Sequence, residues 1–305
     1  MKARKLAAAL ALILVSSFTF AQDYAFKVMA NKGSNEVKSG DAWLPLKTGA
    51  SLKSSDELKI SDNAYIGLIH ASGKPMELRQ SGSYKVADLA AKVGGGSSVI
   101  NKYTDFILSS NAESKKNKLS ATGAVHRATG SHTIHVHLPD NQNSAIYNNT
   151  AVITWDTEAA GPYVVIVSNM ASEELTSYEV TEKTTSINLK DPKYKFNTPG
   201  DPFSAGLIVQ VKSKTDAKQE SKEYMIRALP SKDADKVKQS LNTIISEVTE
   251  QTALNKLILA GFYEENSLLI DAITAYEEAI KLAPDVASYK EAYEEFLLRH
   301  NLKRQ

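Results

Sequence analysis

Short apolar runs separated by turn residues fill residues 24–83. The runs are Ala25–Met29, Ala42–Leu46, Glu57–Ile60, Tyr65–Ile69 and Met76–Leu78, and Gly, Asn, Asp and Ser cluster between them. Short strands at regular spacing with such turns are typical of all-β structure. The pattern predicts a small all-β domain over residues 23–83.

The apolar period changes to that of a helix over residues 84–110. Val86, Leu89, Ala90 and Val93 follow helical spacing, and the glycines at 94–96 end that run. Ser97 can cap a second helix. The apolar face of this second helix comprises Val99, Ile100, Tyr103, Phe106 and Ile107. Residues 111–131 lose the period and are rich in Ser, Asn, Lys, Ala, Thr and Gly, so we expect a mobile linker there.

Residues 132–229 return to a strand pattern. Ile134, Val136 and Leu138 alternate with histidines, and residues 163–167 are almost entirely apolar. Further strand runs occupy residues 152–155, 186–189, 206–211 and 223–229. Six or seven strands over about 95 residues indicate a β-sandwich.

The segment 231–305 has helical periodicity to its end. Val237, Leu241, Ile244, Ile245 and Val248 form one amphipathic face, and another helix is expected over residues 288–298. The predicted fold is therefore multidomain, β then α, with two β units followed by helical hairpins.

Several residues of the first β unit occur in a characteristic order. Trp43-Leu44-Pro45-Leu46 precede Gly49 and Leu52, and Asp56-Glu57-Leu58 precede Ala64-Tyr65-Ile66-Gly67-Leu68. This order resembles the FecR-type domain, although Lys59-Ile60-Ser61 stand where that family usually has Arg-Thr. The resemblance covers about a fifth of the chain. It implies a small all-β fold, which in Gram-negative bacteria is similar to the periplasmic half of regulators that signal to an extracytoplasmic sigma factor.

Two further resemblances concern the later segments. The order Trp155, Tyr163, Leu189 resembles immunoglobulin or fibronectin III-like modules, a fold that carries no function of its own. Residues 231–305 resemble a tetratricopeptide-repeat (TPR) domain at seven positions, namely Leu259, Ala260, Tyr263, Ala272, Tyr276, Ala279 and Pro284. One repeat is visible, from about Ala253 to Val286. Because such repeats normally need about three copies to bury their apolar faces, we expect this one to pack against the sandwich, its flanking helices or a partner.

The repeat resemblance also indicates candidate partner-binding residues. The concave groove of such repeats commonly binds peptides, and one subgroup holds a C-terminal carboxylate with Lys and Asn from the first helix. Leu257 and Gly261 stand at those positions here, so that clamp is absent. Apolar contacts from Leu254, Leu257 and Val286 are then the candidates. The alternative is that these side chains pack on the adjacent helix.

The N-terminal 21 residues have the three-part pattern of a secretory signal peptide. Lys2, Arg4 and Lys5 precede an uncharged run rich in Ala and Leu, and Thr19-Phe20-Ala21 offers a cleavage site before Gln22. The alternative is an uncleaved membrane anchor, but the apolar run is marginal for the roughly 20 apolar residues that a spanning helix needs. We therefore expect residues 1–21 to be removed and the protein to be exported to the periplasm or cell envelope.

Charge and cysteine content exclude several classes of protein. Without residues 1–21 the chain has 33 basic and 35 acidic residues, which argues against a nucleic-acid-binding protein. The chain has no cysteine, so disulfides, thiolate nucleophiles, cysteine zinc sites and a lipoprotein anchor are excluded. No membrane contact beyond a peripheral one is expected.

Four of the six histidines lie between His126 and His137. If their segment is a strand, His135 and His137 point to the same face, where neutral imidazoles can bind zinc, copper or nickel. His126 and His132 are the remaining ligands in reach by sequence. The alternative is a surface strand whose outward positions happen to be His.

The sequence contains no nucleophile elbow, His-Glu-x-x-His helix or calcium loop. We therefore expect a non-catalytic envelope scaffold that binds protein partners and needs no cofactor. The first alternative is a component of FecR-type cell-surface signalling, and the second is a metal-binding protein that uses the 126–137 cluster.

Overall fold

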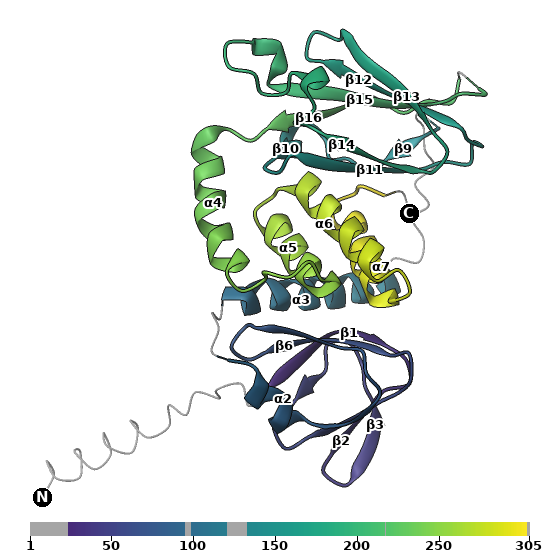
Figure 1. Ribbon diagram of the computed structural model, residues 1–305. Coiled ribbons are helices and arrows are strands. Elements are labelled where there is room, and N and C mark those ends of the chain that lie inside the picture. Colours follow the sequence, from purple (N-terminus) through teal and green to yellow (C-terminus); the bar gives the residue numbers. More distant parts are fainter. Residues whose placement is uncertain (1–23, 95–98, 121–132, 217, 304–305) are drawn as a thin grey trace, which may run out of the picture.

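The computed structural model describes residues 24–94, 99–120, 133–216 and 218–303. They form three tiers, with an N-terminal β unit, a helical tier and a middle β unit stacked in that order in space (Figure 1). The chain is rich in strands through its N-terminal and middle parts and helical at its C-terminal end, which confirms the predicted order of β then α. In space, however, the C-terminal helices lie between the two β units (Figure 1).

The N-terminal β unit consists of two four-stranded sheets, ordered β4-β1-β6-β7 and β3-β2-β5-β8. Its core includes the fully buried side chains of Phe26, Leu52, Leu58, Ile66 and Leu68, which the alternating pattern places on the inner faces. The strands are β1 Phe26–Lys32, β2 Glu36–Ser39, β3 Ala42–Pro45, β4 Ser51–Leu52, β5 Glu57–Ile60, β6 Tyr65–His70, β7 Pro75–Leu78 and β8 Gly82–Lys85.

Two helices follow this unit, α2 (Val86–Lys92) and α3 (Val99–Ser120). Ile100, Tyr103 and Ile107 of the predicted apolar face are buried, whereas Val99 at the first position of α3 is exposed. The helix α3 extends to Ser120, so the linker predicted from residue 111 is wrong in its first part. Lys, Ala, Glu and Leu in that part favour a helix although they lack an apolar stripe. Residues 121–131 of the predicted linker lie outside the described residues.

The middle β unit pairs a five-stranded sheet, β10-β16-β15-β12-β13, with a three-stranded sheet, β14-β11-β9. The alternate residues Tyr163, Val165 and Val167 of β12 are buried and face the core beside Trp155 of β11. The strands are β9 His135–Val136, β10 Ala145–Ile146, β11 Thr150–Asp156, β12 Tyr163–Asn169, β13 Glu174–Val180, β14 Thr184–Asn188, β15 Gly206–Ser213 and β16 Tyr224–Ala228, with three short 3₁₀ turns at η1 Asn141–Asn143, η2 Pro192–Tyr194 and η3 Pro202–Ser204.

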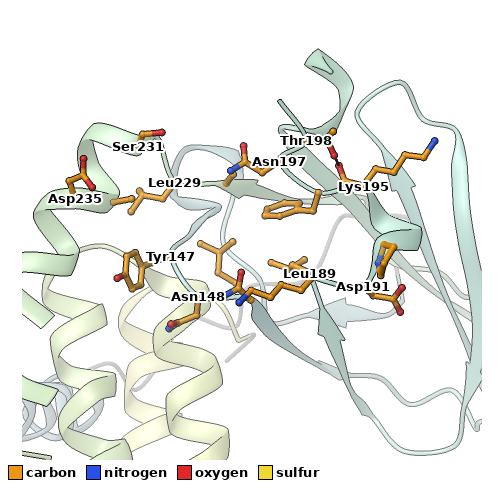
Figure 2. Close-up of a pocket in the computed structure, with 17 residues that line it drawn as sticks. Tyr147, Asn148, Leu189, Asp191, Lys195, Asn197, Thr198, Leu229, Ser231 and Asp235 are labelled. Atoms are coloured by element: carbon orange, nitrogen blue, oxygen red, sulfur yellow. Dashed lines mark hydrogen bonds between the residues drawn. The ribbon is translucent and has the colours of Figure 1, made fainter. Parts of the chain in front are cut away.

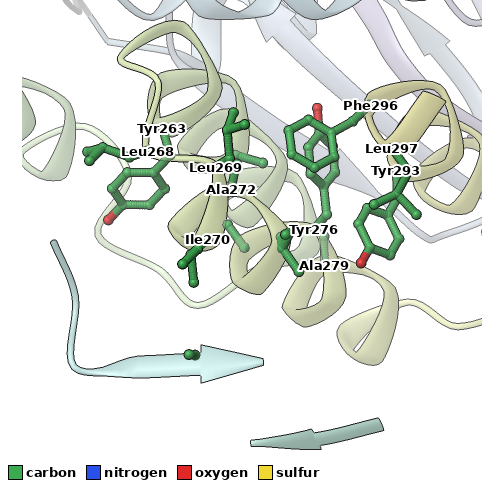
Figure 3. Close-up of a cluster of buried hydrophobic side chains, with 14 of the residues drawn as sticks. Tyr263, Leu268, Leu269, Ile270, Ala272, Tyr276, Ala279, Tyr293, Phe296 and Leu297 are labelled. Atoms are coloured by element: carbon green, nitrogen blue, oxygen red, sulfur yellow. The ribbon is translucent and has the colours of Figure 1, made fainter. Parts of the chain in front are cut away.

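Four helices complete the chain: α4 Ser231–Ile245, α5 Ala253–Glu265, α6 Leu269–Leu282 and α7 Ala287–Arg299. Of the face predicted for α4 and the residues after it, Val237, Leu241, Ile244 and Val248 are buried and Ile245, the last residue of the helix, is exposed. Thr252 caps α5 by accepting the backbone N–H of Asn255, and Ser267 makes the turn to α6 with φ of 59°. Tyr276 of α6 packs on Phe296 of α7 at a centroid distance of 5.1 Å (Figure 3).

The helical tier shares one hydrophobic core with the middle β unit, and this core also reaches the N-terminal β unit. It contains Met29 and Tyr65 from the first unit, Ile153 from the second, and Ile273 from α6. The three parts are therefore packed together and are not separate modules on a linker. None of the helices within the described ranges is both long and apolar enough to cross a bilayer.

Candidate functional site

The candidate site is a groove of about 720 Å³ where the middle β unit meets the first turns of α4 (Figure 2). We call it the α4 groove. It is lined by parts of three segments: residues 146–149, from the end of β10 onward; residues 189–198, around η2; and residues 228–235, from the end of β16 to the first turns of α4. Asn197 and Thr198 lie on the side of the β unit, and Ser231 and Asp235 lie on the side of the helix (Figure 2). The groove thus joins segments that are distant in sequence.

The first wall of the groove is held by a buried carboxylate from α6. Asp271 is 1% exposed and accepts the backbone N–H groups of Tyr147 and Asn148, each at 2.8 Å. The Asn148 side chain in turn donates to the hydroxyl of Tyr263 at 2.8 Å. Burial raises the pKa of Asp271 to about 6, against the opposing effect of the two N–H groups. The residues 147–148 are therefore fixed by the helical tier.

The second wall is a polar loop with its own internal bonds. Asp191 caps η2 by accepting the N–H of Lys193, and Lys195 and Asn197 have φ values of 47° and 53°. Ser204 closes the loop, because its backbone oxygen accepts the Asn197 N–H at 2.6 Å. Non-glycine residues with positive φ are uncommon and are maintained only where surrounding contacts fix the backbone. The loop is therefore a defined wall of the groove.

The groove offers polar groups that are not engaged elsewhere. Within the described residues, the side chains of Asn149, Lys190, Lys195, Asn197 and Asp235 have no hydrogen-bond or ion-pair partner. Its deeper surface is apolar and includes Ile146, Leu189 and Leu229. This lining is complementary to a ligand that has one apolar face and one hydrogen-bonding face.

The structure brings the two histidines predicted as metal ligands together. The ring centroids of His135 and His137 are 6.0 Å apart. His135 Nε2 lies 3.0 Å from the backbone oxygen of Leu302, while His137 contacts Thr154 Oγ1 through Nδ1 at 3.1 Å and Asp156 Oδ2 through Nε2 at 2.9 Å. Among the described residues no group of three or more His, Cys, Asp or Glu is arranged to hold a metal. His126 and His132 lie outside the described residues, so the metal site stays a prediction.

Thr154, His137 and Asp156 have the order of hydroxyl, imidazole and carboxylate that hydrolases use for nucleophilic catalysis. Thr154 is 8% exposed, and its hydroxyl also contacts the hydroxyl of Tyr293 on α7 at 3.1 Å. The Thr154 hydroxyl therefore lies between His137 and Tyr293, and its contact with Tyr293 joins β11 to α7. The hydrogen bond from His137 lowers the pKa of Asp156.

The predicted partner-binding residues are covered by the chain itself. Leu254, Leu257 and Val286 are at most 2% exposed. Leu254 packs against Gly67 of β6, where a Cβ added to the glycine would lie 3.4 Å from Leu254 Cδ1. This agrees with the alternative that the three residues pack within the chain. For Leu254, a partner would have to displace the N-terminal β unit from the start of α5.

Comparison with protein-family models and with curated proteins finds no match for this chain. The α4 groove was not predicted from the sequence. One of its walls could have been suspected, because residues 191–202 contain three prolines and few apolar residues within a β unit. Long polar loops on a rigid framework often carry functional residues. The opposite walls come from other segments, and no periodicity shows that they meet.

Proposed function

We propose that this chain is a non-catalytic binding protein of the bacterial cell envelope that takes its ligand in the α4 groove. The observation that carries the proposal is the groove itself, which has side chains with free hydrogen-bonding groups on walls fixed by Asp271 and Ser204. A pre-organised site of this kind lowers the ordering cost of binding. The buried state of Thr154 supports binding over catalysis.

The finer family assignments belong to this proposal. Two small antiparallel sheets support a FecR-like N-terminal unit, and two facing sheets support an immunoglobulin or fibronectin III-like middle unit. A TPR-like tail is supported by the α5–α6 hairpin, in which Ala260, Ala272 and Ala279 are fully buried between the helices. The helices are covered on both sides, so we assign them a framework role and place ligand binding in the α4 groove.

The binding proposal is tested by retention of envelope components on the immobilised chain. We expect envelope extract to yield components that the parent chain retains and that the double variant Asn197→Ala/Asp235→Ala loses. The matched control is Asn242→Ala/Asp233→Ala, which removes the same side-chain types from exposed positions of α4 outside the groove. Equal retention by the parent chain and both variants would contradict the proposal.

The cellular location is tested separately by the mass of the protein recovered from cells. Export with cleavage predicts an N-terminus at Gln22. An intact Met1 on protein held in the membrane would contradict cleavage and would favour the alternative role in FecR-type signalling, which needs a membrane anchor.

A further inference from the structure

The lining of the α4 groove restricts the chemistry of its ligand. Asn149, Asn197 and Asp235 have free polar atoms that water satisfies in the unbound protein. An apolar ligand would remove that water and leave these groups without partners, which is costly. The ligand must therefore supply many hydrogen-bonding groups of its own.

The groove carries charges of both signs. Lys190 and Lys195 contribute two positive groups, and Asp191 and Asp235 contribute two negative ones. Asp191 is already paired with Lys193 at 3.2 Å, so the unpaired charges of the lining are two positive and one negative. A strongly anionic ligand would approach Asp235, and a strongly cationic one would approach the two lysines, so the groove favours a ligand without a large net charge.

The hydrogen-bonding groups match hydroxyls better than they match a peptide backbone. Each Asn amide both donates and accepts, and a hydroxyl does the same, so an amide can bond two neighbouring hydroxyls. Asp235 accepts only, and the half-buried ring of Tyr147 offers an apolar face with a polar tip. A peptide would be held by a free strand edge or by deep apolar side-chain pockets. The groove is instead walled mainly by loops and by the start of α4.

We propose that the α4 groove binds a neutral oligosaccharide, with Asn149, Asn197 and Asp235 bonding its hydroxyls and Tyr147 lying against an apolar face of a sugar ring. This inference rests on the proposed function, because it names the ligand class of the same groove. The volume of about 720 Å³ is sufficient for more than one sugar ring.

The direct test titrates the purified full chain with three probes, cellotetraose, maltotetraose and the tetramer of N-acetylglucosamine, in a calorimeter. We expect at least one to bind, and we expect Asn197→Ala and Asp235→Ala each to weaken it about tenfold. The controls Asn242→Ala and Asp233→Ala should bind like the parent chain. Absence of binding by all three probes at about 10 mM, or equal binding by the groove variants, would overturn the inference.

A second test separates this inference from the proposed function. Envelope extract is treated with protease in one arm and with periodate, which cleaves vicinal diols, in the other. Groove-dependent retention that survives protease and is lost after periodate supports an oligosaccharide. Retention that survives both treatments supports it when the N-acetylglucosamine tetramer competes, because the internal rings of that tetramer have no vicinal diol, and overturns it when the tetramer does not compete. Retention that is lost after protease and survives periodate overturns the oligosaccharide but leaves the proposed binding function. No groove-dependent retention in untreated extract overturns both.

Discussion

Glu264 of α5 is the centre of a buried ionic network, and removing it should have a large effect on stability. Its side chain is 1% exposed and that of Arg299 on α7 is 18% exposed. Arg299 Nη2 donates to both carboxylate oxygens, at 2.8 and 3.1 Å, and Nε donates to Oε1 at 3.1 Å. The hydroxyl of Tyr276 donates to Oε2 at 3.1 Å, and His300 Nε2 lies 3.0 Å from Oε1. One carboxylate thus joins α5, α6 and α7.

The size of the expected stability loss depends on the charge that Glu264→Ala leaves without a partner. Glu264→Ala leaves the Arg299 guanidinium largely buried without its counter-ion, and such a change typically costs about 3–5 kcal/mol. The double variant Glu264→Leu/Arg299→Met removes both charges and fills a similar volume with apolar groups. It should therefore lose much less stability than Glu264→Ala alone. Burial disfavours the charged form of Glu264, but His300 and Arg299 outweigh that effect and lower its pKa. The stabilisation is therefore present above the ordinary pKa of a glutamate and is lost as the pH falls through the lowered value.

The assay is urea unfolding followed by tryptophan fluorescence. The chain has two tryptophans, of which Trp155 is 2% exposed in the core shared with the helical tier and Trp43 is 38% exposed on the N-terminal β unit. In a Trp43→Phe background, Trp155 is the one remaining tryptophan and reports unfolding of the core that the middle β unit shares with the helical tier. We expect Glu264→Ala to lower the midpoint by roughly 1–2 M urea. Equal losses in Glu264→Ala and in the double variant would refute the argument that the unpaired guanidinium causes the cost.

Three further predictions concern other contacts of the helical tier. A Cβ at Gly261 would lie 2.7 Å from Ile107 Cδ1, so Gly261→Ala should lower stability by about 1–3 kcal/mol and Ile107→Ala in the same chain should recover part of it, as measured by urea unfolding. Burial raises the pKa of Asp271 from 3.8 to about 6, so the folded state favours the protonated carboxyl group. The parent chain should therefore lose stability relative to Asp271→Asn as the pH rises from about 4 to about 6, as measured by urea unfolding. A constant difference in stability between the two chains across that range would contradict the raised pKa. Since the hydrogen bond from His137 lowers the pKa of Asp156, His137→Leu should raise that pKa in a carboxyl NMR titration, and an unchanged titration would show that the bond has no such effect.

Elements with a clear apolar period could be predicted from the sequence. The strand β5 has the bounds expected for it, α5 and α6 lie within the predicted repeat at residues 253–286, and α7 is within one residue of its predicted limits, because buried positions recur on one face. Strands β2, β4, β8, β10 and β13 were not predicted. The residues of β13 are all exposed or half-buried at the edge of its sheet, so the alternation that marks a buried strand is absent.

The candidate site could not be predicted for a different reason. Tyr147, Asp191 and Asp235 are ordinary polar surface residues in sequence, and only the packing of α6 and α4 on the middle β unit places them around one groove. For Leu254 the sequence left two alternatives, a partner contact or packing within the chain, because sequence does not show which apolar helix face the N-terminal β unit covers.

The position of the α5–α6 hairpin connects the groove with the N-terminal β unit. At the start of α5, the backbone N–H of Leu254 donates to Glu77 Oε1 at 3.1 Å, and Glu77 also accepts the hydroxyl of Tyr65 at 2.6 Å. A carboxylate at a helix N-terminus is favourable for its charge as well as its hydrogen bonds. At the start of α6, Asp271 holds the groove wall at residues 147–148. Each β unit is therefore bonded to the first turn of one helix of the same hairpin. Because Ala260, Ala272 and Ala279 are fully buried and let these two helices pack closely, one hairpin joins the two β units.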